Sequence, residues 1–330
     1  MEELIRRLTE AFGPSGFEEP VREMVKAAIG DAADEMRVDA MGNLIASKYG
    51  DGSGRKVMVA AHMDEIGVIS THVTKAGFLR FTGIGGLRLQ TLLGARVRFA
   101  GGQLGVVYCE RLPTRMTLHP LERHYIDVGA ANREDCPVSV GTPGIFERSF
   151  LHVGQRYIGK SMDDRVGCAV AVAALRQLNE TPHDVHFVFS VQEEVGARGA
   201  LAAANMLGVD VGIAIDVTLT GDTLKGPHMA VRLGQGPAIK VKDAGMIAHR
   251  GLVRLMRRRA EEMKIAYQLE VLEGGSTDAR SVQIAGAGAA AGCISIPCRY
   301  VHSQSETVHA ADVDQARELL VDLLSKPLDL

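Results

Sequence analysis

The order of apolar segments constrains the fold of this chain more than any other feature of its sequence. Short apolar runs typical of buried strands lie at 56–61, 185–191, 211–217 and 292–297, and segments with helical spacing separate them. This alternation predicts an α/β fold in which helices cover both faces of a mixed or parallel sheet. With 330 residues, the chain can bury a large core and form two domains.

The alternation is interrupted between residues 66 and 157. Short alternating runs follow one another there, punctuated by glycine pairs and prolines, as is typical of a small β-rich unit. We therefore expect one α/β domain formed by residues 1–66 and 156–330. A barrel-like β-domain at 67–155 is inserted into it.

Local signals place the remaining elements. A first helix should end before Pro14, and Ser15 with Glu18 matches a capping box that would open a second helix ending at Gly30. Residues 163–178 are apolar on more than one face, which predicts a buried helix. Further helices are expected at 198–207, 247–264, 277–285 and 311–325, and further strands at 36–38, 43–47, 240–241 and 267–272.

Composition excludes several classes of protein. Lys plus Arg is 37 and Asp plus Glu is 40, and this near balance argues against a nucleic-acid-binding protein. No apolar run is long enough to span a membrane, and the N-terminal segment lacks the apolar region of a secretory signal. The five cysteines form no C-x-x-C pair. We therefore expect a cytoplasmic protein.

Polar side chains gather where the predicted buried strands end. Ligands of open α/β sheets bind at the carboxyl ends of the strands, so these side chains are the first candidates for a functional site. The candidates at the strand ends are His62, Asp64, Glu193, Glu194, Asp216 and His302, and Asp163 with Asp164 opens the buried helix.

Two imidazoles and three carboxylates of this set suit Zn²⁺, Co²⁺ or Mn²⁺. Five ligands exceed what one catalytic zinc needs, but they serve two divalent metal ions if one carboxylate bridges them. We expect His62 and Asp216 on one ion, Glu194 and His302 on the other, and Asp163 shared.

Two further residues have expected roles beside the metals. Glu193 adjoins a proposed ligand but points elsewhere, so it can act as the general base. Asp64 can accept the second imidazole N–H of His62 and fix its tautomer. Taken singly, each of these residues also has an ordinary explanation, such as a solvent-facing histidine or a helix-capping acid. Their joint position beside apolar elements favours the site.

Two glycine-rich segments are candidate binding loops. Residues 83–86 do not complete the G-x-G-x-x-G pattern, and the chain has no phosphate loop and no nucleophile elbow. Residues 274–278 read either as a tight turn feeding a helix or as the wall of a substrate pocket.

Six motifs in order resemble one family. They are AAHMDEIG (60–67), KSMDDRVGCAVA (160–171), VQEEVGARGA (191–200), IDV (215–217), GGSTDA (274–279) and ISIPCRYVHSQSE (294–306). They are similar to motifs of the TET-type, glutamyl-aminopeptidase-like dinuclear metallo-aminopeptidases, some of which carry an endoglucanase label. The resemblance covers nearly the whole chain. It departs at the inserted Ser276 and at Gln304, where the family usually has proline.

The resemblance implies a zinc-peptidase-like fold, peptide substrates with a free N-terminus, and attack by a hydroxide that bridges the two metals. It implies the metal ligands and the roles of Glu193 and Asp64 given above, with Asp163 or Asp164 as the bridge and Asp163 preferred. It also implies that the insertion serves homo-oligomerisation, from dimers to twelve-subunit shells.

Three other functions remain open at this point. A deacylase of N-acyl amino acids could use the same metal pair. An endoglucanase would need two carboxyl groups and no metal, and the absence of Trp counts against it. A non-catalytic peptide-binding protein would be expected to lack some of the seven site residues.

Overall fold

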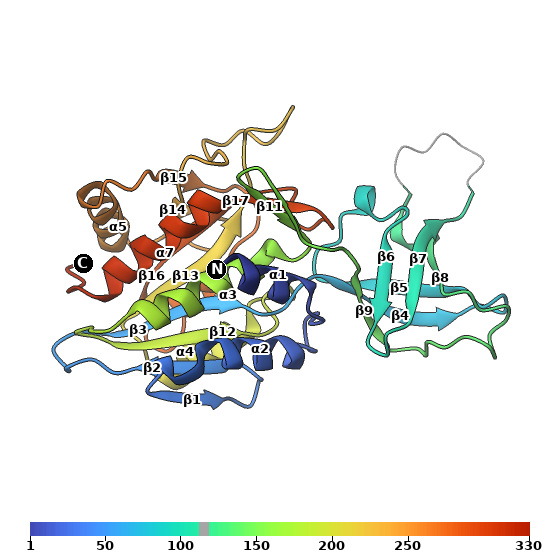
Figure 1. The fold of residues 1–330 in the computed structure, drawn as a ribbon, viewed down its shortest axis with the longest axis horizontal. Coiled ribbons are helices and arrows are strands. Elements are labelled where there is room, and N and C mark those ends of the chain that lie inside the picture. Colours follow the sequence, from blue (N-terminus) through green and yellow to red (C-terminus); the bar gives the residue numbers. More distant parts are fainter. Residues whose placement is uncertain (112–118) are drawn as a thin grey trace.

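The computed structural model describes residues 1–111 and 119–330 and has two parts (Figure 1). A large mixed sheet covered by helices forms the larger part, and a closed six-stranded barrel stands to one side of it. The predicted α/β sheet with an inserted barrel is therefore confirmed. Within the described ranges, no helix is long and apolar enough to cross a membrane.

The large sheet has the strand order β1-β2-β12-β3-β13-β16-β17-β11-β10, and β14 and β15 attach to it through β16. The strands β12, β3, β13 and β16 run parallel to their neighbours in this group, so their carboxyl ends share one edge. The bounds are β1 Glu35–Val38, β2 Leu44–Lys48, β3 Lys56–His62, β10 Leu151–Val153, β11 Arg156–Gly159, β12 Asp184–Ser190, β13 Val211–Thr218, β14 Ala238–Lys242, β15 Gln268–Val271, β16 Ala290–Arg299 and β17 Glu306–His309.

Alternating side chains of the central strands bury both faces of this sheet. In β3, Val57 and Val59 pack into the main core, whereas Met58 and Ala60 pack into a smaller cluster on the other face. The main core is covered by α1 (Glu2–Glu10), α2 (Glu19–Ile29), α3 (Met162–Gln177), α5 (Arg250–Glu262) and α7 (Ala310–Leu324). The other face is covered by α4 (Arg198–Leu207) and α6 (Asp278–Gln283). The α3 helix is buried along most of its length, as its sequence predicts.

The barrel closes in the order β4-β5-β8-β7-β6-β9 around a core of its own. Its strands are β4 Gly67–Val73, β5 Leu79–Ile84, β6 Arg96–Phe99, β7 Leu104–Cys109, β8 His124–Asp127 and β9 Pro143–Phe146. Short 3₁₀ turns lie at Gly30–Ala32, Leu89–Thr91 and Leu121–Arg123. After β9, the chain returns to the large sheet, where β11 pairs with both β10 and β17.

The expected capping box is wrong. The α2 helix begins at Glu19 without a side-chain cap, and the Ser15 hydroxyl donates instead to the Asp64 carboxylate, 2.6 Å away. Glu18 accepts the N–H of Gly16 rather than serving the helix. A long-range hydrogen bond at the edge of the sheet has therefore replaced the local one.

Candidate metal centre and substrate pocket

Five of the predicted residues meet at the shared carboxyl edge of the parallel strands. His62 is the last residue of β3, and Asp216 lies near the end of β13. Glu194 follows β12, His302 follows β16, and Asp163 lies in the first turn of α3. Residues separated by up to 240 positions therefore form one cluster, because the parallel strands deliver their ends to one place.

The Asp163 carboxylate lies at the centre of this cluster. Its Oδ1 is 3.0 Å from Nε2 of His62, and its Oδ2 is 3.3 Å from Nε2 of His302. The carboxylate of Asp216 is 3.9 Å from His62 Nε2, and that of Glu194 is 3.2 Å from His302 Nε2. Asp163 thus stands between one His–Asp pair and one His–Glu pair, which is the arrangement that a bridging ligand would need.

Both imidazoles turn the same nitrogen toward the cluster. Nδ1 of His62 lies 3.1 Å from the carbonyl oxygen of Asp64, and Nδ1 of His302 lies 2.8 Å from the carbonyl oxygen of Gly86. Because a carbonyl only accepts hydrogen bonds, each Nδ1 carries the proton, and Nε2 can offer its lone pair to a metal ion. The donor set therefore fits divalent cations.

Asp164 differs from its neighbour in what its oxygens contact. Its Oδ2 accepts the backbone N–H of His62 at 3.2 Å, and its Oδ1 accepts that of Gly167 at 3.1 Å. The side chain is fully buried. Ligand atoms within 4.8 Å of one another can be grouped as His62, Asp163 and Glu194, or as His62, Asp164 and Asp216. Between the two aspartates we favour Asp163 as the shared ligand, because both Asp164 oxygens already accept backbone N–H groups.

The cluster concentrates negative charge in a buried place. Burial raises the pKa of the carboxyl groups of Glu194 and Asp216, and the negative charge of Asp163 adds to both shifts. At Asp163, burial acts in the same direction, but hydrogen bonds with the two histidines outweigh it and lower the pKa. Divalent cations would supply the positive charge that such a set of carboxylates lacks.

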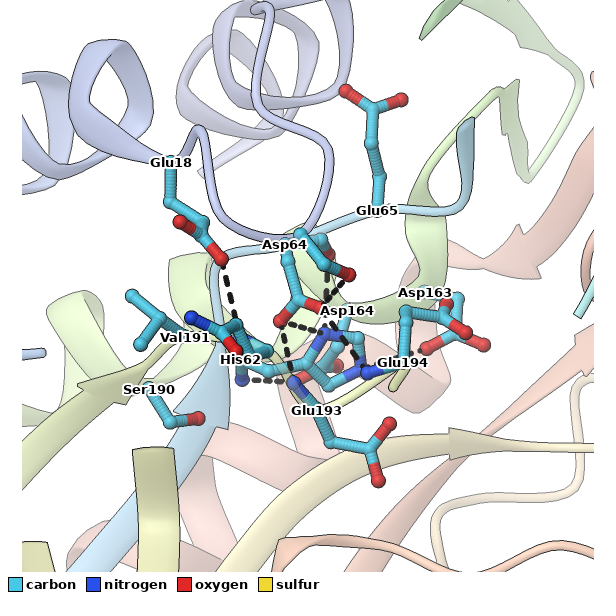
Figure 2. Close-up of polar contacts among 12 residues, drawn as sticks. Glu18, His62, Asp64, Glu65, Asp163, Asp164, Ser190, Val191, Glu193 and Glu194 are labelled. Atoms are coloured by element: carbon cyan, nitrogen blue, oxygen red, sulfur yellow. Dashed lines mark hydrogen bonds and ion pairs between the residues drawn. The ribbon is translucent and has the colours of Figure 1, made fainter. Parts of the chain in front are cut away.

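Asp64 orders the backbone beside the cluster, as Figure 2 shows. Its carboxylate accepts the N–H of Glu193 at 2.9 Å and that of Glu194 at 3.1 Å. Its Oδ1 also lies 3.5 Å from Nδ1 of His62, so the closer partner of the imidazole is the Asp64 carbonyl. Asp64 therefore meets the His62 N–H with its backbone carbonyl, not with the carboxylate that the sequence suggested, and its carboxylate holds two residues that the sequence did not connect to it.

Glu193 lines a pocket of about 400 Å³ that opens above the cluster. Burial raises the pKa of its carboxyl group well above the usual range, and the negative charges of Asp278 and Asp216 add to the shift. Its position on the pocket wall beside the cluster is the place that a general base would need to occupy.

The lining of this pocket also contains the glycine-rich segment 274–277, together with Leu272 and Arg280. Thr277 also accepts a hydrogen bond from the N–H of Ala279 at the start of α6. The two interpretations of this segment, turn and pocket wall, are therefore both correct.

Two groups near the site were missed in the sequence. The loop at 83–86 leaves the barrel and reaches the cluster, where a Cβ on Gly85 would lie 3.1 Å from Glu194. The buried Glu306 accepts two backbone N–H groups of ligand-bearing segments. Contacts to backbone atoms leave no periodic pattern in a sequence, although Glu306 closes the last of the six motifs.

Comparison with known proteins identifies the family. A family model described as M42 glutamyl aminopeptidase matches residues 42–319, and the chain belongs to this family. A putative aminopeptidase of Acetivibrio thermocellus is 44% identical over 98% of both chains. Lysyl aminopeptidase of Pyrococcus furiosus is 36% identical, over 99% of this chain and 98% of its own. Family and relatives together support an aminopeptidase, a hydrolase of peptides.

Solved structures share the fold. The TET aminopeptidase of Thaumarchaeota archaeon SCGC AB-539-E09 has a TM-score of 0.95 and 34% identity, covering 98% of this chain and 96% of its own. The TET1 peptidase of Pyrococcus horikoshii has a TM-score of 0.89 and 33% identity, with 98% and 99% covered. A Thermotoga maritima structure named endoglucanase has a TM-score of 0.82 and 29% identity, with 97% and 96% covered.

Proposed function

We propose that this chain is a two-metal aminopeptidase that removes amino acids from the free N-terminus of peptides. The observation that carries the proposal is the position of Asp163, whose two oxygens face two different imidazoles. His62 and Asp216 would hold one ion, His302 and Glu194 the other, and Asp163 both. Zinc or cobalt suits these donors best, and manganese is also compatible.

Two such ions would polarise the scissile carbonyl and lower the pKa of a water molecule in the site. Glu193, on the pocket wall, takes a proton from the attacking water and passes it to the leaving amine. Asp64 accepts the backbone N–H of Glu193 and so holds this residue beside the site. The carbonyls of Asp64 and Gly86 keep the two imidazoles in the tautomer that binds metal.

The test is hydrolysis of a panel of aminoacyl-p-nitroanilides by protein treated with EDTA, before and after addition of Zn²⁺, Co²⁺ or Mn²⁺. N-acetylated versions of the same substrates form the second arm. We expect cleavage of the free substrates only, and only with metal. Cleavage restricted to N-acyl substrates would indicate a deacylase and overturn the proposal. Hydrolysis that survives complete removal of metal would overturn the two-metal mechanism.

We further propose that residues 67–155 form an oligomerisation domain, and that 1–66 and 156–330 form the catalytic domain. On β7, Leu104, Val106 and Tyr108 alternate outward and are each more than 40% exposed, so the barrel presents an apolar stripe to solvent. The related TET1 peptidase of Pyrococcus horikoshii can assemble into a tetrahedron or a large octahedral shell.

Light scattering coupled to size exclusion measures the assembly directly. We expect a homo-oligomer between a dimer and a dodecamer, and a smaller particle when Leu104 and Tyr108 are both replaced by Glu. A monomeric wild-type protein would contradict the proposed role of the insertion.

We also propose a cytoplasmic location, which agrees with the five cysteines being free of disulfides.

A further inference from the structure

Glu306 places one buried carboxylate between two parts of the proposed metal centre. It is the first residue of β17, and its side chain is 1% exposed. Its Oε2 accepts the N–H of Asp163 at 2.9 Å, and its Oε1 accepts the N–H of His302 at 2.7 Å. One side chain is thus bonded to the main chain of the proposed bridging ligand and of a ligand to the second ion.

The two residues joined in this way come from separate elements. Asp163 lies in the first turn of α3, where its backbone dihedrals are not helical. His302 lies in the loop after β16 with a φ of 63°, in the left-handed region that side chains other than glycine rarely adopt. Neither N–H takes part in a regular helix or strand ladder, so Glu306 is what fixes both.

The other buried carboxylates of the site accept backbone N–H groups from a different combination of residues. Asp64 accepts from Glu193 and Glu194, which are neighbours in one loop. Asp164 accepts from His62, but its second partner, Gly167, is not a proposed ligand. Within the described part of the chain, Glu306 alone bonds to the backbone of two proposed ligands from different elements.

We infer that Glu306 is a positioning residue that sets the separation of His302 from Asp163 and thereby maintains the second metal site. The inference rests on the two-metal function proposed above. It requires two acceptor oxygens, because both partners are N–H donors. A carboxylate offers two acceptors, whereas an amide of the same size offers one acceptor and one donor group.

The test is titration of EDTA-treated full-length protein with Co²⁺ by calorimetry, for wild type and Glu306→Gln, with metal content measured after dialysis. Outer partners of metal ligands typically contribute about 10–100-fold to metal affinity. We therefore expect Glu306→Gln to weaken one of the two sites by about 10–100-fold. Peptidase activity should fall at low Co²⁺ and recover in excess Co²⁺.

Asp312 provides a matched control. It is fully buried, and its Oδ2 and Oδ1 accept the N–H groups of Gly234 at 2.7 Å and Gly236 at 2.8 Å. Asp312→Asn therefore makes the same chemical change at the same kind of carboxylate, but away from every proposed ligand. We expect it to lower stability without changing the affinity for either ion.

The outcomes separate the inference from the function on which it rests. Wild-type Co²⁺ affinities in Glu306→Gln would overturn the inference, and so would an equal loss in Asp312→Asn. If Glu306→Gln does not fold, Glu306→Asp replaces it as the test variant. Its shorter carboxylate cannot reach both N–H groups, so it should show the same selective loss of Co²⁺ affinity. Unchanged Co²⁺ binding in Glu306→Asp would overturn the inference. A wild-type chain that binds fewer than two ions would instead overturn the proposed metal centre.

Discussion

At the scale of single residues, the two members of each adjacent acidic pair, Asp163 with Asp164 and Glu193 with Glu194, have different contacts. Asp163 faces both imidazoles, whereas Asp164 accepts backbone N–H groups. Both glutamates line the pocket, but Glu194 also lies 3.2 Å from Nε2 of His302. The sequence could place both pairs at the sheet edge, because each pair adjoins a buried apolar element. It could not decide within the first pair, because that depends on side-chain directions set by local backbone.

Exchanging the two glutamates for glutamine separates base from ligand. We expect Glu193→Gln to retain two metal ions and to lose about 10²–10⁴-fold in kcat, because the amide cannot accept the proton. Glu194→Gln should lose affinity for one ion. Metal analysis and kinetics on the same preparations check both results. Loss of metal in Glu193→Gln with metal retained in Glu194→Gln would mean that the two roles are reversed.

At the scale of elements, the apolar periodicity located the helices and central strands to within a few residues, but it missed three of the short strands. These are β10, β11 and β17, which have three or four residues each and therefore show little periodicity. The capping box at Ser15 was misread because Asp64, 49 positions away, takes the hydroxyl. The role of the loop at 83–86 was also invisible, since glycine there serves a close approach rather than a binding motif.

The close approach of Gly86 to His302 makes this loop sensitive to one methyl group. A Cβ at Gly86 would lie 2.9 Å from Nδ1 of His302, so Gly86→Ala must displace the imidazole. We expect about 10–100-fold weaker binding of one metal ion and a matching loss of kcat/KM. Gly83→Ala is the control, since its Cβ would meet Leu87 at 2.9 Å and no ligand. Equal behaviour of the two variants would refute a specific role for Gly86.

An ion pair anchors the segment between β13 and β14 to the end of β16. Arg299 donates from Nε and Nη2 to Asp222 at 3.1 and 2.7 Å. Burial raises the pKa of Asp222, but hydrogen bonds from Arg299 and from the backbone N–H of Leu233 outweigh it and lower the pKa to about 2. A lowered pKa stabilises the fold above the unfolded value near 3.9, and this contribution is lost as the pH falls toward about 2.

Asp222→Asn should therefore destabilise the protein by about 1–2 kcal/mol at neutral pH, after allowance for partial exposure of the pair. The difference from wild type should shrink between about pH 4 and pH 2. Denaturant unfolding of EDTA-treated protein across this range measures it. A difference that is constant with pH would show that the Asp222 charge does not contribute.

At the scale of the whole molecule, a buried charge network ties the N-terminal segment to the sheet. Glu65 contacts Lys160 at 2.7 Å and Arg165 at 3.2 Å, and all three side chains are at most 3% exposed. Arg165 in turn donates to the carbonyls of Leu8 and Gly13. Figure 2 shows the Glu65 side chain directed away from His62. This network therefore stabilises the packing of the N-terminal segment and does not contribute ligands to the site.

Removing the charge of Glu65 should therefore cost stability. We expect Glu65→Gln to lower the free energy of unfolding by about 3–5 kcal/mol, because two buried cations lose their partner. Glu110 also pairs with two arginines, Arg80 and Arg123, but all three side chains are at least 31% exposed. Glu110→Gln should cost much less than Glu65→Gln, because water screens exposed ion pairs. Similar losses in the two variants, measured by denaturant unfolding, would contradict this account.

The central claim is that two metal ions share Asp163. The most direct measurement is a crystal structure of the Co²⁺-loaded protein with anomalous scattering data. We predict two cobalt peaks about 3.5–4 Å apart, with Asp163 between them. One peak should lie beside His62 and Asp216, and the other beside Glu194 and His302. A single peak, or two peaks bridged by Asp164, would contradict the claim.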